Sequence, residues 1–229
     1  MGLKENLERV HERIRRAAER AGRKPEDVKL VVVTKYVDSS VVKELVRLGV
    51  RDIGENRAQD LVRKYDEVND PNVTWHFIGR IQTNKIKYIV PRCEWIHSVY
   101  REEELEEIEK RASALGKVQK ILVEVNVFGE ETKAGVRPEE VEKFLELCKK
   151  YDHVLVLGLM TMAPYVEDPE NVRWGFRRLR EMLEELSKHN AGNVFLRELS
   201  MGMSNDFEIA VEEGATMVRI GSAIFEGGK

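Results

Sequence analysis

The chain has 229 residues, of which 42% are hydrophobic and 34% are charged, and it carries a formal net charge of −3. The apolar fraction is sufficient for a globular core, which excludes wholesale disorder. The balance of 38 basic against 41 acidic residues provides no excess charge to attract nucleic acid or an acidic membrane.

Three features of the sequence indicate a cytoplasmic protein. Its two cysteines, Cys93 and Cys148, lie far apart and have no partner at metal-ligand spacing, which is typical of free thiols in a reducing compartment. The first residues contain no apolar signal region, and Asn6 lacks the hydroxyl that myristoylation at Gly2 requires. The longest apolar stretch, residues 154–160, is too short to span a bilayer.

Short β-branched runs alternate with charged amphipathic stretches along the chain. The first element is a helix, because apolar residues recur at helical spacing before Gly22 and Pro25 (Leu3, Leu7, Val10, Ile14 and Ala17). Apolar runs then predict strands at 28–34, 50–54, 74–79, 94–99, 120–127, 154–161, 194–200 and 216–221. Helices are predicted between them, at 39–48, 57–65, 83–89, 101–115, 138–151, 170–189 and 205–213.

This alternation predicts the α/β class and a parallel sheet, because each crossover between parallel strands needs about a dozen residues. The strands and the length together predict a single domain over residues 1–229, a (β/α)8 barrel of the TIM type with an extra N-terminal helix. The sequence ends soon after the last strand, so we expect the N-terminal helix to take the place of a final helix. An open doubly wound sheet is the alternative, because periodicity does not show closure.

A lysine follows the first strand, and barrels of this kind carry their chemistry where the strands end. Lys35 shares its strand parity with Val31 and Val33 in the run VVVTKY. Desolvation at an apolar strand end favours the neutral amine that a nucleophile needs. The simpler interpretation, which the strand by itself favours, is that Lys35 marks where the strand meets water.

Small-residue turns follow the last two strands. Residues 199–206 read LSMGMSND, with Ser204 as a candidate helix N-cap, and residues 218–223 read VRIGSA, with Gly221 and Ser222 at the turn. Barrels that bind phosphate commonly use the loops after strands seven and eight, where free N–H groups form an anion site. A phosphate site at the same mouth as a strand-end lysine indicates pyridoxal 5′-phosphate (PLP), which needs both.

With these motifs the sequence resembles the pyridoxal phosphate homeostasis proteins (the YggS/PROSC family), single-barrel relatives of the cofactor domain of alanine racemase. The matching stretches are VTK at 33–35, GEN at 54–56, HFIG at 76–79, QTNK at 82–85, GLMTM at 158–162, LSMGMSND at 199–206 and VRIG at 218–221. The serine-methionine-glycine segment and its spacing to Arg219 are highly specific together. Glu226 departs from the family, which usually has glycine there, and this affects the C-terminal turn and not the site.

The resemblance implies that PLP is the cofactor and that Lys35 holds it as a Schiff base. It also implies that Ser204, Gly221 and Ser222 bind the phosphate of the cofactor. Arg219 would be the partner of the pyridine nitrogen, and Asn56 and His76 would lie beside the ring.

Three of these residues have structural alternatives. Arg219 could pair with a buried carboxylate, although the neighbouring phosphate turn favours the cofactor. Asn56 could cap the helix that starts at Arg57, and capping is compatible with cofactor contact. His76 could be a satisfied core residue, which is the commoner role of a strand histidine. The remaining histidines, His97 among them, show no metal-ligand spacing, and we expect no metal.

The resemblance implies a carrier or regulator that acts in PLP homeostasis without efficient catalysis, as a monomer or weak dimer. Apo forms of PLP-dependent enzymes are candidate partners, and nucleic acid and membranes are not. The first alternative is a PLP-dependent amino-acid racemase of the alanine racemase type. The second, from the residues alone, is a barrel enzyme that acts on a phosphorylated substrate with Lys35 as nucleophile.

Two features favour the carrier over the racemase. If Arg219 faces the pyridine nitrogen, that nitrogen should remain unprotonated, because a guanidinium has no acceptor, and the ring is then a poor electron sink. Racemases of this kinship add a second base, a tyrosine from an additional β domain, which we expect to be missing because the sequence ends at Lys229. Tyr36 should point away from Lys35 by strand alternation, which leaves Tyr165 as the other tyrosine near the mouth.

Overall fold

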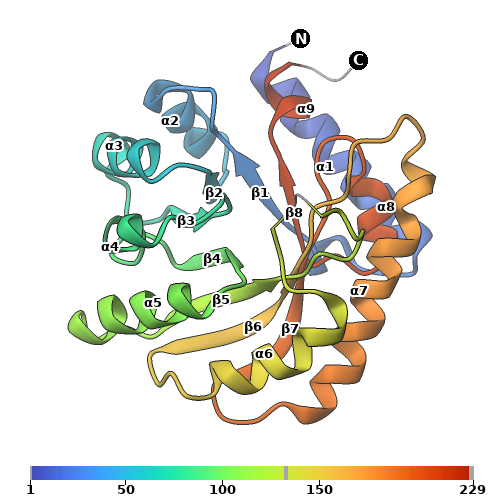
Figure 1. Ribbon diagram of the computed structural model, residues 1–229. Helices are drawn as coiled ribbons and strands as arrows, with labels where there is room; N and C mark the ends of the chain where they lie inside the picture. The colour runs from blue at the N-terminus through green and yellow to red at the C-terminus, as the bar shows by residue number, and fades with distance from the viewer. Residues whose placement is uncertain (1, 132–133, 227–229) are drawn as a thin grey trace.

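The computed structural model describes residues 2–131 and 134–226, which form a closed barrel of eight parallel strands (Figure 1). Each strand pairs with the next, and β8 closes on β1 with Lys29 opposite Met217. The predicted TIM-type barrel is confirmed, and the open sheet is wrong. The strands are β1 (Lys29–Val33), β2 (Asp52–Glu55), β3 (Thr74–Phe77), β4 (Trp95–Val99), β5 (Gln119–Glu124), β6 (Val154–Met160), β7 (Val194–Ser200) and β8 (Met217–Ile220).

Helices surround the barrel and connect successive strands (Figure 1). They are α1 (Leu3–Arg20), α2 (Ser39–Arg47), α3 (Ala58–Val68), α4 (Ile86–Ile89), α5 (Glu102–Ala114), α6 (Val141–Cys148), α7 (Arg173–Leu186), α8 (Phe207–Glu212) and α9 (Ser222–Phe225). Two predicted helices, 138–151 and 170–189, begin with 3-10 turns, at Pro138–Glu140 and Pro169–Val172. Proline suits a first turn because its missing N–H would have no partner there. None of the described helices is long and apolar enough to cross a membrane.

Strand alternation divides the core into two layers. The larger layer lies between strands and helices, and it includes Trp75 and Phe77 of β3. The smaller one fills the barrel interior and consists of Trp95, Leu122, Leu157, Met160 and Met217. Because His76 lies between Trp75 and Phe77, its side chain points inward, and polar groups therefore share the interior with the smaller layer.

The N-terminal helix occupies the place that a long final helix would take. In Figure 1, α1 lies beside α8 and α9, and it packs against both. Asn6 of α1 donates from Nδ2 to the Ile224 carbonyl oxygen at 2.9 Å, and Asn6 is buried. The predicted role of the N-terminal helix is confirmed.

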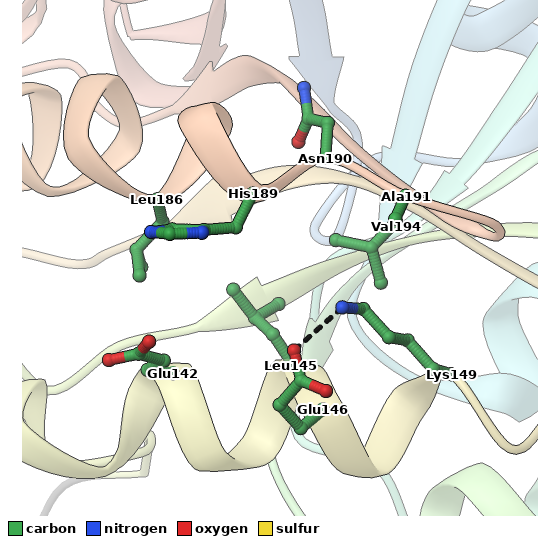
Figure 2. A pocket seen from close by; sticks show the side chains of 9 residues that line it. All are labelled: Glu142, Leu145, Glu146, Lys149, Leu186, His189, Asn190, Ala191 and Val194. Carbon is green, nitrogen blue, oxygen red and sulfur yellow. Dashed lines mark hydrogen bonds and ion pairs between the residues drawn. The ribbon is translucent and has the colours of Figure 1, made fainter.

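Among the described residues, hollows on the outer helix layer include two between neighbouring helices and loops. The one in Figure 2, about 290 Å³, lies between α6 and the segment after α7, where Lys149 pairs with Glu146 at 2.6 Å. The other, about 650 Å³, lies between Tyr100, residues 135–137 and α6. Neither is lined by a residue that the sequence assigns to the cofactor.

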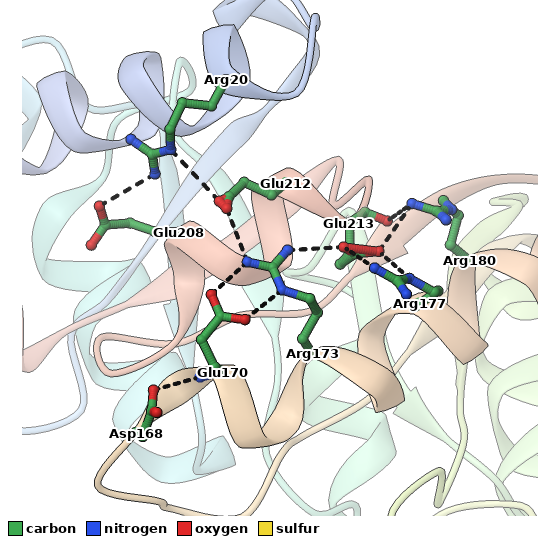
Figure 3. Close-up of polar contacts among 9 residues, drawn as sticks. All are labelled: Arg20, Asp168, Glu170, Arg173, Arg177, Arg180, Glu208, Glu212 and Glu213. Carbon is green, nitrogen blue, oxygen red and sulfur yellow. Dashed lines mark hydrogen bonds and ion pairs between the residues drawn. The ribbon is translucent and has the colours of Figure 1, made fainter.

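Ion pairs join α7, α8 and α1 (Figure 3). Glu213, directly after α8, is almost buried, and three arginines of α7 donate to it, Arg173, Arg177 and Arg180. Arg20 of α1 lies 3.7 Å from Glu212 and 3.9 Å from Glu208. Although burial opposes it, the hydrogen bonds from Arg177 and Arg173 lower the pKa of Glu213. Many of the chain's charged residues therefore support helix packing.

Candidate functional site

Lys35 lies two residues beyond β1, at the carboxyl-terminal mouth of the barrel. Its side chain is exposed, because the apolar part of the strand ends at Val33. This agrees with the interpretation that Lys35 marks where the strand meets water. The Nζ atom lies 5.0 Å from the centre of the Tyr36 ring, and Tyr36 is 89% exposed. The expectation that Tyr36 points away from Lys35 is wrong, since strand alternation has ended here.

The turn after β8 lies against the end of β1. A Cβ atom on Gly221 would lie 3.0 Å from the Val33 carbonyl oxygen, so the close approach of these two backbones favours glycine. Ser222 follows as the first residue of α9 and is exposed. The first N–H groups of a helix have no partner within it. This turn therefore presents N–H donors beside Val33, which precedes Lys35 by two residues.

The turn after β7 joins the turn after β8 through Ser204. The Ala223 N–H donates to Ser204 Oγ at 3.1 Å. The predicted N-cap role of Ser204 is wrong, because α8 begins at Phe207, with Asp206 at its N-cap position. Asp206 Oδ1 instead accepts from the Met203 N–H at 2.8 Å and shapes the turn itself. The structure thus brings Ser204, Gly221 and Ser222 together.

Asn56 follows β2 at the same mouth and does not cap a helix. The next helix, α3, begins at Ala58, and no side chain caps it. The Asn56 Oδ1 atom is buried and has no hydrogen-bond partner among the described residues. Its backbone is covered by Gly79, where a Cβ would lie 2.0 Å from the Asn56 carbonyl oxygen. The capping interpretation is wrong, and the Asn56 amide oxygen remains buried at the mouth without a hydrogen-bond partner among the described residues.

Arg219 extends into the barrel interior from β8 and is 3% exposed. Its guanidinium donates from Nη1 to Ser200 Oγ at 2.5 Å and from Nη2 to the Thr161 carbonyl oxygen at 3.0 Å. No ion pair joins it directly to a carboxylate within residues 2–131 and 134–226, although Glu124 and Asp206 favour its charge. Burial lowers the pKa of Arg219 to about 10, so it stays protonated at neutral pH.

His76 is fully buried and satisfied by two partners. Its Nε2 atom lies 2.8 Å from Asp52 Oδ1, and its Nδ1 atom lies 2.9 Å from Nε2 of His97. His97 Nδ1 lies 2.8 Å from Ser200 Oγ, the same oxygen that accepts from Arg219. The structure therefore links His76 to Arg219 through other side chains and shows it as the satisfied core residue of the sequence alternatives.

Four residues of this region escaped the sequence reasoning. His97 was considered only for metal-ligand spacing, whereas its inward position on β4, next to His76 on β3, was the usable signal. Ser200 stood in a quoted motif without a role. Glu55 and Lys64 form a buried pair at 2.7 Å beneath the mouth, and Lys64 also donates to the Thr34 carbonyl oxygen, next to Lys35.

The residues at this mouth fit PLP. Its aldehyde can react with the exposed amine of Lys35, and its phosphate matches the hydroxyls and N–H donors of the two joined turns. The guanidinium of Arg219 is a donor suited to an unprotonated pyridine nitrogen. The Oδ1 atom of Asn56 is a buried acceptor for which the described residues offer no hydrogen-bond partner.

Comparison with known proteins gives a consistent family. A family model described as alanine racemase, N-terminal domain, matches residues 6–228. The chain is 49% identical over 225 residues to the pyridoxal phosphate homeostasis protein of Aquifex aeolicus, covering 98% of each chain. The protein of the same name from Escherichia coli K12 is 32% identical over 224 residues, covering 96% of this chain and 94% of that one.

Solved structures share the barrel. PipY of Synechococcus elongatus PCC7942, solved with PLP bound, has a TM-score of 0.84 at 32% identity, covering 98% of this chain and 100% of PipY. The alanine racemase of Clostridium difficile 630 has a TM-score of 0.75 at 18% identity, covering 97% of this chain and 56% of the racemase, and shares the fold. The family model and the relatives together show that the chain belongs to the pyridoxal phosphate homeostasis protein family, built on the alanine racemase N-terminal domain.

Proposed function

We propose that this protein binds PLP as a Schiff base on Lys35 and acts in PLP homeostasis as a carrier or regulator. The observation that supports this most strongly is the meeting of the Lys35 segment with the two small-residue turns at one barrel mouth. The PLP-bound structure of its relative PipY supports the same cofactor. In this proposal residues 1–229 act as one PLP-binding unit in the cytoplasm.

Each residue at the mouth has a role in the proposal. Ser204 and Ser222 donate hydroxyl hydrogen bonds to the phosphate, together with N–H groups around Gly221. Arg219 donates to the pyridine nitrogen, and Asn56 binds beside the ring. His76 supports Arg219 from below, through the contacts described above, and does not itself touch the cofactor.

Two features argue against efficient catalysis: the partner of the ring nitrogen, and the lack of a fixed tyrosine base among the residues considered at the mouth. The electron sink that PLP supplies when bound is strongest when its ring nitrogen is protonated. The Arg219 guanidinium has no lone pair, so it cannot accept a hydrogen bond from a protonated ring nitrogen and favours the unprotonated form. Ser200 and Thr161 hold the guanidinium in place. Tyr36 and Tyr165, the tyrosines that the sequence analysis considered near the mouth, are 89% and 80% exposed, so neither is fixed as a second base.

The experiment that separates a carrier from a racemase uses the PLP-loaded protein. It is incubated with L-alanine in deuterated water, and loss of the α-proton is followed by NMR, with Lys35→Ala as the control. We expect exchange far slower than about 1 per second, the low end of ordinary enzyme turnover. Exchange or racemisation at that rate or faster, dependent on Lys35, would overturn the carrier and support the racemase.

A further inference from the structure

A continuous line of hydrogen-bonded side chains crosses the barrel interior. This core line comprises Asp52, His76, His97, Ser200 and Arg219, with contacts of 2.8, 2.9, 2.8 and 2.5 Å in that order. It starts at the amino end of β2, where the Asp52 side chain is 18% exposed. It ends on β8, and the His97–Ser200 contact joins β4 to β7, which are not neighbours in the sheet.

The end groups of the core line determine which way its hydrogen bonds run. Arg219 only donates, so Ser200 Oγ accepts from it. The Asp52 carboxylate only accepts when ionised, so His76 donates to it from Nε2. With neutral rings, His97 then donates from Nε2 to His76 Nδ1, and Ser200 donates its hydroxyl proton to His97 Nδ1. Every group has a partner, and all donors point from Arg219 toward Asp52.

Together, burial and nearby charges favour the neutral form of both imidazoles. Burial lowers the pKa of His76, and Asp52 and Glu94 oppose this while Lys29 adds to it. Burial also lowers the pKa of His97, and the cations of Arg219 and Lys29 add to the effect. An additional proton on His76 would turn its Nδ1 into a donor and reverse the line between His76 and Ser200. It would also place a third cation between Lys29 and Arg219.

We propose that Ser200, His97 and His76 are positioning residues that hold Arg219 toward the cofactor. His97 Nδ1 accepts the hydrogen bond that the Ser200 hydroxyl donates, so the lone pairs of that oxygen face the guanidinium. Arg219 is then fixed by two acceptors, Ser200 and Thr161, and its remaining N–H donors are free to meet a ring at the mouth. The positioning role rests on the proposed function, because it requires PLP at the mouth. The hydrogen bonds of the core line do not depend on it.

The first test concerns the protein without cofactor. Histidine side-chain 15N NMR at pH 7 should show His76 and His97 as neutral rings protonated at Nε2, with assignments made from His76→Gln and His97→Gln. An imidazolium signal, or a ring protonated at Nδ1, would overturn the inferred direction of the core line. This result does not depend on PLP.

The second test concerns the PLP-loaded protein. His97→Leu removes both contacts of the ring, so we expect about three- to tenfold weaker PLP retention and a shifted visible absorption band. His97→Gln offers one donor and one acceptor and should restore part of both. His153→Gln, which removes a hydrogen-bonded histidine elsewhere, is the control and should match the parent protein.

The outcomes separate the two ideas. If the parent protein binds no PLP, the proposed function fails, and the NMR signals still decide whether the core line exists. If the parent binds PLP and His97→Leu keeps its affinity and its absorption band, the positioning role is wrong. Should His97→Leu fail to fold, Ser200→Ala replaces it, because it cuts the core line next to Arg219 while removing only a hydroxyl.

Discussion

At the residue scale, Glu124 is a buried carboxyl group whose pKa is strongly raised. It ends β5, is 7% exposed, and lies close enough to Arg219 to be attracted by it. Burial raises its pKa from 4.5 to about 7, and the attraction of Arg219 only partly opposes this. The folded protein therefore holds this proton more tightly than the unfolded chain does.

This pKa predicts how stability depends on pH. Between pH 4.5 and pH 7 the folded state binds more protons at Glu124, so its contribution to stability falls as the pH rises through this range. The side chain of Glu124→Gln cannot ionise. The free energy of unfolding of the cofactor-free variant, minus that of the parent, should therefore be up to about 3 kcal/mol larger at pH 8 than near pH 4.5. Denaturant unfolding of both proteins at the two pH values checks this. A constant difference between them would contradict the raised pKa.

The two serines of the joined turns give a second prediction. Each hydroxyl bond to a charged phosphate should contribute about 1.5–3 kcal/mol of binding, so Ser204→Ala with Ser222→Ala should lose PLP on dialysis. The backbone donors remain, and we expect weakening and not complete loss. Ser187→Ala, which removes an exposed hydroxyl bonded to the Glu184 carbonyl oxygen, is the control. Retention as in the parent, with unchanged thermal stability, would count against this phosphate site.

At the scale of elements, a buried ion pair fastens α3 to the end of β2. Lys64 and Glu55 are both fully buried, and Thr34 contributes a hydroxyl to Glu55 and a carbonyl oxygen to Lys64. Burial raises the pKa of Glu55, while Lys64 and Thr34 oppose the rise. The residue after Thr34 is Lys35, so the pair supports the segment that carries the proposed Schiff base.

Removing one member of this pair should be far more damaging than removing both. Lys64→Met leaves the Glu55 carboxylate buried without its cation, and we expect a loss of about 3–5 kcal/mol. Adding Glu55→Gln should recover most of that loss, because no buried charge remains. Lys188→Met, which breaks an exposed pair with Glu185, should leave stability nearly unchanged. The free energy of unfolding in denaturant measures all three, and equal losses in Lys64→Met and the double variant would contradict the buried charge.

The ends of elements were less predictable than their existence. Each predicted strand and helix overlaps an observed one, because periodicity reports burial over many residues. The helix predicted at 205–213 begins only at Phe207, since Asp206 bonds to the Met203 N–H and Ser204 bonds to Ala223. Such local competition among polar side chains depends on the folded turn.

For the whole molecule, closure of the barrel determines what the sequence could reveal about the site. Strand-end positions placed Lys35, Ser204 and Gly221 at one mouth correctly, because parallel strands end on the same side. Asn56 came only from the family resemblance. The inward strand positions of His76 and His97 could have indicated the middle of the core line. Its link to Arg219 was beyond sequence reasoning, since the contact between His97 and Ser200 joins residues 103 positions apart across the interior. The exposure of Lys35 agrees with the interpretation that the strand by itself favoured, because the apolar run ends at Val33.

Whether PLP attaches to Lys35 can be determined by trapping the Schiff base. The PLP-loaded protein is reduced with borohydride and digested, and the adduct is located by peptide mass spectrometry. We expect a reduced pyridoxyl phosphate group on the peptide that contains Lys35, and no adduct in Lys35→Ala. An adduct on a different lysine of the parent protein, or no adduct at all, would contradict it.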